Sequence, residues 1–434
     1  MTTNAPARRA RKLNDFVDLN RSSFHSHYRA YLADRSMSPS ASPYEKLKSF
    51  LSLQFALRVW KFSKAFFSFR AKFQDYDYAA GESGIFPLAG NEDSNATVPE
   101  EIRVGLAGDW GTGTDEAEAI AERMADSKPH YTIHLGDVYY LGDYAEVNEH
   151  CLDKTVGGYP YKTVRWPHGS LGSFALNGNH EMYANGKGYF NLFLPTLGFV
   201  GSGPGSPPAK PQSASFFCLK NRDWMMIGLD TGFNSAGWPS LFSPCKLEDA
   251  LLDWLRDRVK PKDFSGAIVL LGHHQYFSAF DRGYERPAQQ LAQIIGDRPV
   301  LWFWGHEHRF AIYGKYGAVG KIQAYGRCIG HGGMPVSRGS PITSSAVPLV
   351  IYDNREYDVL GATSVGYNGY ANLTFKGNAL SVQYYTLAKP LPHNRSLLIT
   401  ETWEARNGEP VGTGIRKLNN DLKQISPNLS AAQT

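Results

Sequence analysis

The sequence is poor in cysteine and has no cysteine pair with the spacing of a metal or redox motif. Only four cysteines occur in 434 residues, and they are widely separated: Cys151, Cys218, Cys245 and Cys328. Small secreted proteins held together by disulfides have denser and more regular cysteine spacing. We therefore expect reduced, buried thiols and a cytoplasmic protein.

Long apolar runs and a strong net charge are also missing. No uncharged apolar run reaches the ~18 residues that a membrane-spanning helix needs. Residues 1–15 are basic, but the apolar region of a secretory signal peptide does not follow them. The net charge of +4 is too small to indicate a nucleic-acid partner. These absences favour a cytoplasmic protein, and the net charge decides little about its partners.

The length and composition predict a globular protein with three parts. We expect an N-terminal helical extension and linker over 1–98, a main domain over 99–405 and a polar tail over 406–434. Within the extension, Leu47–Phe73 lacks Pro and Gly and repeats Phe at helical spacing. A basic amphipathic helix of this kind can lie on an anionic membrane surface. Its apolar residues occupy two faces, however, which favours packing against protein or an oligomer contact.

From Ile102 the pattern alternates between short apolar strands and helices. Residues 102–108 and 131–136 are suited to buried strands, and a helix that starts near Asp115 separates them. Such a strand–helix–strand unit favours a parallel pair. After Ile312 strands dominate. The sequence therefore predicts an α/β fold, an αββα sandwich of two mixed sheets.

Five short polar segments each follow one of the predicted strands. Ligands bind beyond the carboxyl ends of strands in open α/β sheets, so these segments can converge on one site. Asp, Asn, Tyr and His are oxygen and imidazole donors suited to Fe, Mn or Zn. The segments are Gly108-Asp109-Trp110-Gly111, Gly136-Asp137-Val138-Tyr139-Tyr140, Gly178-Asn179-His180-Glu181, Gly272-His273-His274 and Gly305-His306-Glu307-His308.

The order of these segments resembles the signature of calcineurin-like metallophosphoesterases. The resemblance covers Asp109 to His308, with each element in order. It implies two metal ions, with Asp137 bridging them. It also implies that Asp109 and His308 hold the first ion and that Asn179, His273 and His306 hold the second.

Two positions are similar to the purple acid phosphatases within that superfamily. Most members have a histidine two residues after the first aspartate, where this chain has Gly111, and Tyr140 follows Asp137 by three residues. The resemblance implies that Tyr140 is a phenolate ligand of Fe(III), with Fe, Zn or Mn as the second ion. The alternative is that Tyr140 only packs in its loop.

The mechanism implied is in-line attack on a phosphomonoester by a metal-bound hydroxide. In the family, the residue at His180 contacts the phosphate and protonates the leaving group; the alternative is that it orients Asn179. His274 and His331 are further candidates for substrate binding, and Arg309 and Arg327 for a second substrate charge.

Several other functions remain as alternatives. The arginines that clamp phosphate in serine/threonine phosphatases of this superfamily are absent from the Asp137 and Asn179 segments. This argues against a protein phosphatase and favours a small-molecule phosphoester as substrate. A phosphodiesterase, a phospholipid phosphoesterase and a non-catalytic metal-binding scaffold are the competing interpretations.

Overall fold

The computed structural model describes most of the chain from residue 69 onward. The described ranges are 69–88, 100–156, 163–200, 208–235, 245–334, 336, 342–359, 363–388 and 394–434. The predicted helix over Leu47–Phe73 falls almost entirely outside these residues. Among the described residues, no helix has the length and apolar character needed to cross a bilayer.

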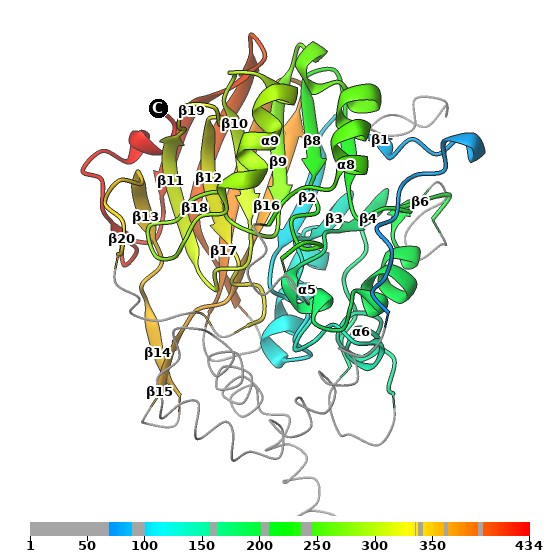
Figure 1. Cartoon of the computed structure of the whole chain (residues 1–434). Helices are drawn as coiled ribbons and strands as arrows, with labels where there is room; N and C mark the ends of the chain where they lie inside the picture. Colours follow the sequence, from blue (N-terminus) through cyan, green and yellow to red (C-terminus); the bar gives the residue numbers. More distant parts are fainter. Residues whose placement is uncertain are drawn as a thin grey trace, which may run out of the picture.

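Two nine-stranded mixed sheets form the centre of the fold (Figure 1). In the first, β8, β9, β10 and β12 are parallel to one another. Its strand order is β1 (Ile85–Pro87), β7 (Phe217–Lys220), β8 (Trp224–Gly228), β9 (Ala267–Gly272), β10 (Val300–Trp304), β12 (Ala324–Ile329), β11 (Phe310–Tyr316), β13 (Leu349–Tyr352) and β20 (Lys423–Gln424).

The second sheet joins a parallel part to an antiparallel part. Strands β2, β3 and β4 run parallel, and β16 attaches the antiparallel strands to β2. Its order is β19 (Glu409–Lys417), β18 (Asn394–Arg406), β17 (Ala379–Ala388), β16 (Gly369–Lys376), β2 (Ile102–Ala107), β3 (Tyr131–His134), β4 (Gly172–Ala175), β5 (Gly198–Phe199) and β6 (Lys210–Pro211). A separate ribbon pairs β14 (Glu356–Val359) with β15 (Thr363–Gly366).

Helices cover the outer faces of the sandwich. Helices α8 (Asp249–Trp254) and α9 (Glu285–Ile295) lie over the first sheet in Figure 1. Helix α5 (Asp115–Asp126) contacts β16 and β17 of the second sheet, and α6 (Tyr144–Cys151) shares its apolar cluster. The two sheets bury most of the core between them. The predicted sandwich of two mixed sheets is therefore confirmed.

The strands of the main domain end where the sequence pattern predicted, with small shifts. Strand β2 and strand β3 form the predicted parallel pair, and α5 lies between them in sequence. The side chain of Thr114 caps α5 by accepting from the backbone N–H of Ala117, so the helix begins where its capping residues predicted.

Both ends of the main domain differ from the prediction. Strand β1 falls within the predicted linker, and it extends the first sheet by pairing with β7. The predicted polar tail contains β19 and β20, which pair with β18 and β13. Strands β19 and β20 are polar because they lie at sheet edges and are only partly buried, so their hydrophobic periodicity is weak.

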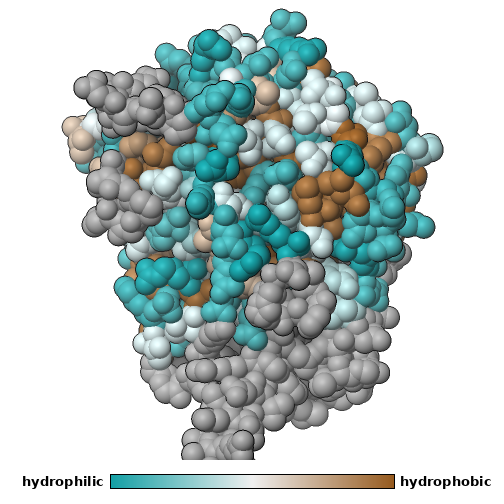
Figure 2. Space-filling view, turned by 180° about the vertical axis from the view of Figure 1, so that it is seen from behind, coloured by the Kyte–Doolittle hydropathy of each residue, from teal (hydrophilic) through white to brown (hydrophobic). Residues whose placement is uncertain are grey.

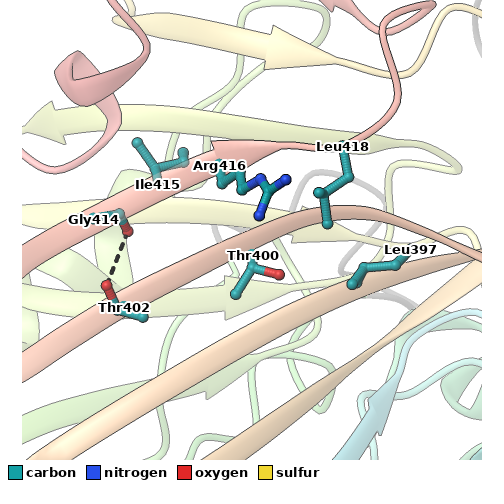
Figure 3. A pocket seen from close by; sticks show the side chains of 7 residues that line it. All are labelled: Leu397, Thr400, Thr402, Gly414, Ile415, Arg416 and Leu418. Carbon is teal, nitrogen blue, oxygen red and sulfur yellow. Dashed lines mark hydrogen bonds between the residues drawn. The ribbon is translucent and has the colours of Figure 1, made fainter.

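The face turned away from the viewer in Figure 1 is largely hydrophilic. Figure 2 shows hydrophobic residues there as separate patches rather than as one continuous surface. A shallow pocket lies on the outward face of β18 and β19 (Figure 3). Its lining residues are Leu397, Thr400, Thr402, Gly414, Ile415, Arg416 and Leu418, none of which belongs to the five strand-end segments.

Candidate metal centre

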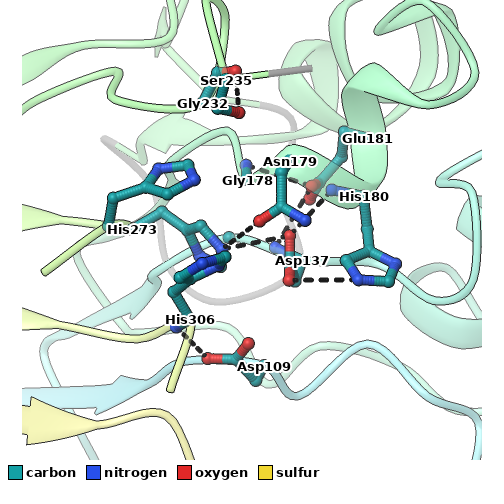
Figure 4. Close-up of polar contacts among 12 residues, drawn as sticks. Asp109, Asp137, Gly178, Asn179, His180, Glu181, Gly232, Ser235, His273 and His306 are labelled. Atoms are coloured by element: carbon teal, nitrogen blue, oxygen red, sulfur yellow. Dashed lines mark hydrogen bonds and ion pairs between the residues drawn. The ribbon is translucent and has the colours of Figure 1, made fainter. Parts of the chain in front are cut away.

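The strand-end segments converge on one buried cluster (Figure 4). Asp109 follows β2 and Asp137 follows β3, and the two carboxylates are almost completely buried. The first sheet contributes His273 after β9 and His306 after β10. Residues from both sheets therefore meet at the same end of the sandwich.

Three of these residues adopt a left-handed backbone conformation. The φ angles are +57° for Asp109, +73° for Asp137 and +64° for His306. For residues other than glycine this region costs roughly 1 kcal/mol or more. Such strain is tolerated where it aims a side chain at a functional site. We infer that the three loops adopt this backbone conformation because it directs their side chains into the cluster.

Close approach of the loops requires glycine beside Asp137. A Cβ atom added at Gly178 would collide with the Asp137 carboxylate. Gly136 has a φ of +98°, and a Cβ there would lie 2.8 Å from Nδ1 of His273. Glycine at these positions lets three loops approach to hydrogen-bonding distance.

Asp137 is at the centre of the cluster. Its Oδ1 accepts from the backbone N–H of His180 at 3.0 Å and lies 3.2 Å from Nε2 of His273. Burial alone would raise the pKa of Asp137, but the charges of His273 and His180 hold it well below its usual value. The carboxylate is therefore ionised and available as a ligand.

His273 has one nitrogen fixed by the backbone and one turned into the cluster. Its Nδ1 lies 2.9 Å from the carbonyl oxygen of Leu135, which accepts the ring proton. Its Nε2 lies 3.1 Å from Oδ1 of Asn179. Histidines that bind metals are commonly oriented by such a backbone contact. The Asn179 amide is oriented in turn, because its Nδ2 donates to the hydroxyl of Tyr183 at 3.1 Å.

Tyr139 brings its hydroxyl to the first group of predicted ligands. Its Oη lies 2.7 Å from Oδ1 of Asp109, 3.0 Å from Oδ2 of Asp137 and 2.9 Å from Nε2 of His308. A tyrosine hydroxyl has one proton, so it cannot satisfy two carboxylates at once. One of these two carboxylate contacts therefore has no hydrogen from the phenol, and a metal cation bound by the three oxygen atoms would fill that place.

The sequence prediction assigned the phenol ligand to the neighbouring Tyr140, and that assignment stays a prediction. The ring of Tyr140 packs against the small cluster of Tyr139 and Met334, and its backbone carbonyl faces Nδ1 of His180 at 2.7 Å. The two tyrosines are adjacent in a turn, so spacing along the sequence alone could not show which of them brings its hydroxyl to the cluster. The doublet of tyrosines was the only signal for Tyr139.

His180 lies beside the cluster rather than within it. Its Nε2 lies 3.8 Å from Oδ2 of Asp137. Its Nδ1 contacts the carbonyl of Tyr140, which accepts the proton of that nitrogen and leaves Nε2 turned toward Asp137. The ring packs between those of Tyr139 and Tyr183.

The other two histidines proposed for substrate binding occupy different surroundings. His274 is buried beside His306, with ring centroids 4.5 Å apart, and its Nδ1 lies 3.2 Å from Oγ1 of Thr231. His331 is fully buried against Phe310, and among the residues that the structure describes neither ring nitrogen has a hydrogen-bond partner. Burial lowers the pKa of His331 to about 4, so it is neutral at pH 7.

Neither of the arginines proposed for a second substrate charge is free to take that role. Arg309 lies over the Phe280 ring at 3.9 Å and is 8% exposed. Arg327 is fully buried and paired with Glu401.

The donor chemistry fits metal binding, and His273 belongs to both of two overlapping groups of possible ligands. One group of ligand atoms comes from Asp109, Asp137 and His273, and the other from His273, His274 and His306. Within each group the ligand atoms lie within 4.8 Å of one another. Carboxylate and imidazole donors without thiolate suit Fe, Mn and Zn.

The family model of the calcineurin-like phosphoesterases matches residues 102–310. No curated protein matches the chain.

Several solved structures are distantly similar. GAP50, "the anchor in the inner membrane complex of Plasmodium", is 14% identical and is covered over 88% of its chain, against 69% of this one, with a TM-score of 0.41. PhoD is 12% identical; the alignment covers 73% of PhoD and 77% of this chain, with a TM-score of 0.41. Vacuolar Protein Sorting 29 from Cryptosporidium parvum is 13% identical; the alignment covers 98% of that protein and 70% of this chain, with a TM-score of 0.30.

Proposed function

We propose that this protein is a dinuclear-metal phosphoesterase that hydrolyses phosphomonoesters. The observation that carries the proposal is the convergence of Asp109 and Asp137 with His273 and His306 at one buried strand end (Figure 4). Asp137 is the proposed bridging ligand, with Asn179 and His308 completing the two positions. Bound metals would supply Lewis acidity and a hydroxide at neutral pH.

We assign the phenol ligand of the first position to Tyr139. Its hydroxyl lies within 3.0 Å of the three atoms that would share that position. A phenolate is a hard anionic donor and favours Fe(III), the ion that characterises a purple acid phosphatase. Tyr140, the residue predicted from the sequence, remains the alternative, and Fe, Zn and Mn all fit the second position.

The chain itself supplies orientation and a proton. The Leu135 carbonyl fixes the ring of His273 so that Nε2 faces the cluster, and Tyr183 fixes the amide of Asn179. The Tyr140 carbonyl holds the Nδ1–H of His180, which leaves Nε2 to carry the proton for the departing alkoxide. His180 is thus the proposed general acid.

The test of this proposal uses two substrates that differ in their leaving group. Wild-type protein should contain about two metal ions and hydrolyse both p-nitrophenyl phosphate and phenyl phosphate. His180→Asn should lower kcat by about 10²–10⁴-fold on phenyl phosphate and much less on p-nitrophenyl phosphate, because a good leaving group needs little protonation. His168→Asn, outside the cluster, is the control.

Other outcomes select the competing functions. Faster turnover of bis-p-nitrophenyl phosphate than of either monoester would support a phosphodiesterase. Bound metal without hydrolysis of any phosphoester would support the metal-binding scaffold.

A further inference from the structure

A short loop between β9 and α9 brings an arginine and a tyrosine to the second group of ligands. Tyr284 packs its ring against those of His274 and His306, at centroid distances of 4.8 and 5.7 Å. Its hydroxyl lies 3.3 Å from Nε2 of His306. Arg282 donates from Nη2 to this hydroxyl at 3.1 Å, and its guanidinium lies 4.8 Å from the centre of the tyrosine ring.

The loop is held in place by a buried glutamine. The side chain of Gln275 donates to the carbonyl oxygen of Arg282 at 2.9 Å. The backbone N–H of Tyr284 donates to the carbonyl of Gln275, also at 2.9 Å. Gln275 is fully buried, so both ends of the loop segment are anchored to the core. Arg282 is exposed at the surface while its guanidinium remains beside the cluster.

The Tyr284 hydroxyl can accept a hydrogen bond and donate its one proton in another. A guanidinium only donates, so the hydroxyl oxygen accepts from Arg282 and keeps its own proton available. In this structure that proton can point to Nε2 of His306. If His306 uses Nε2 as a ligand atom, that nitrogen has no lone pair left to accept a hydrogen bond. The hydroxyl must then donate to another acceptor close to the same position.

A phosphoryl group is the acceptor with the matching charge. It is a dianion near neutral pH, and charge-assisted hydrogen bonds from guanidinium to phosphate are strong. The arginines of the protein phosphatases are absent from this chain, and Arg309 and Arg327 are engaged elsewhere.

We propose that Arg282 and Tyr284 bind the phosphoryl group of the substrate, and free phosphate as product, beside His306. This inference rests on the proposed phosphoesterase function and adds to it a binding element outside the five strand-end segments. Tyr284 contacts a phosphoryl oxygen through its hydroxyl proton, and Arg282 supplies the positive charge behind it.

The experiment measures the binding of inorganic phosphate to the metal-loaded protein by calorimetry, together with KM and kcat for p-nitrophenyl phosphate. Arg282→Gln should weaken phosphate binding and raise KM by about tenfold each, the loss of one charge-assisted contact, while kcat changes by less than about twofold. Tyr284→Phe should weaken phosphate binding by about threefold to tenfold. Arg282→Lys should recover part of the loss, since it restores the charge.

The matched control is Arg222→Gln, because Arg222 is 85% exposed and pairs only with its neighbour Asp223. It should leave phosphate binding unchanged. Metal content is measured in every variant, and it should equal that of the wild type.

Two results would overturn the inference. Phosphate affinity in Arg282→Gln equal to that of the wild type would show that the guanidinium does not bind the phosphoryl group. Loss of metal from either variant in proportion to the loss of phosphate binding would show that the loop only supports His306. A wild-type protein that loads metal but neither binds phosphate nor hydrolyses a phosphoester would sink the proposed function, and this inference with it.

Discussion

Two clusters of buried charged residues lie inside the sandwich, and they differ in how their hydrogen-bonding capacity is met. The first is the strand-end cluster around Asp137. The second joins Arg327 on β12 to Glu401 on β18, both fully buried. Arg327 has five N–H donors. All five have acceptors: two from Glu401 and one each from the carbonyls of Tyr313, Gly326 and Ala432.

The second cluster is complete within the chain. One carboxylate balances one guanidinium, and the Tyr384 hydroxyl donates to Glu401 at 2.6 Å. The strand-end cluster instead brings two carboxylates, a phenol and several imidazoles together, with one phenolic proton among the atoms around Tyr139. Burying charge is costly unless it is compensated. The Arg327–Glu401 pair is therefore balanced within the chain, whereas the Asp137 cluster has the donor atoms of a candidate metal site.

The largest expected effect is on kcat, which should fall when the strand-end cluster is altered but not when the Arg327 cluster is. Asp137→Asn removes the proposed bridging carboxylate and should lower kcat by at least ~10³-fold on p-nitrophenyl phosphate. Tyr384→Phe removes one hydrogen bond from the other cluster and should leave kcat within about twofold. Steady-state kinetics on both variants, with metal analysis, makes the measurement. Equal losses in the two variants would remove the functional distinction between the clusters.

The next largest effect is on the free energy of unfolding, and it concerns the Arg327–Glu401 pair. Arg327→Met leaves the Glu401 carboxylate buried without its partner, which should lower the free energy of unfolding by about 3–5 kcal/mol. Arg406→Met breaks an exposed pair with Glu404 and should cost less than about 1 kcal/mol. Urea denaturation of metal-free protein measures both.

In the same assay Asp137→Asn should lower the stability of the metal-free protein at pH 7, because the charges of His273 and His180 hold the pKa of the Asp137 carboxyl well below its usual value and so stabilise its ionised form. A variant at least as stable as the metal-free wild type would show that these histidines do not compensate the buried carboxylate.

A third prediction concerns which tyrosine serves the strand-end cluster. Tyr139→Phe should lose the visible absorption of a phenolate–iron contact and lower metal affinity by about 10–100-fold. Tyr140→Phe should keep the absorption band, since its ring packs beside Met334. Visible spectra of the two iron-loaded variants make the measurement. Loss of the band in Tyr140→Phe alone would restore the assignment made from the sequence.

The smallest expected effect uses a buried histidine that belongs to neither cluster. The pKa of His331 is lowered to about 4 by burial, against about 6.5 in the unfolded chain. Between these values the unfolded chain binds a proton that the folded chain does not, so His331 makes stability fall as the pH falls from 6.5 to 4.

His331→Leu should remove this dependence, which amounts to about 1 kcal/mol between pH 6.5 and 5.5. Urea denaturation at pH 7.5, 6.5 and 5.5 compares the two proteins. Parallel pH dependence in wild type and variant would show that folding does not lower the pKa of His331.

Much of the fold was predictable because its signals are local. The apolar runs that became β2, β3, β9 and β10 are buried on both faces, so they read as strands without knowledge of their neighbours. Strands β19 and β20 were not predicted, because they lie at or near sheet edges and are only partly buried. Their pairing depends on strands far away in the sequence, which local composition does not show.

The candidate ligands and their place at the strand ends could be predicted from the sequence alone. Asp109, Asp137, Asn179, His273 and His306 each follow a glycine after a strand, and His308 belongs to the same segment as His306, so the pattern depends on residues close in sequence. Folding, and not the local sequence, brings the Tyr139 hydroxyl to Asp109, pairs Arg327 with Glu401, and places Arg282 and Tyr284 beside His306. The reason is physical: these contacts join side chains whose direction and distance are set by the packing of the two sheets and their loops.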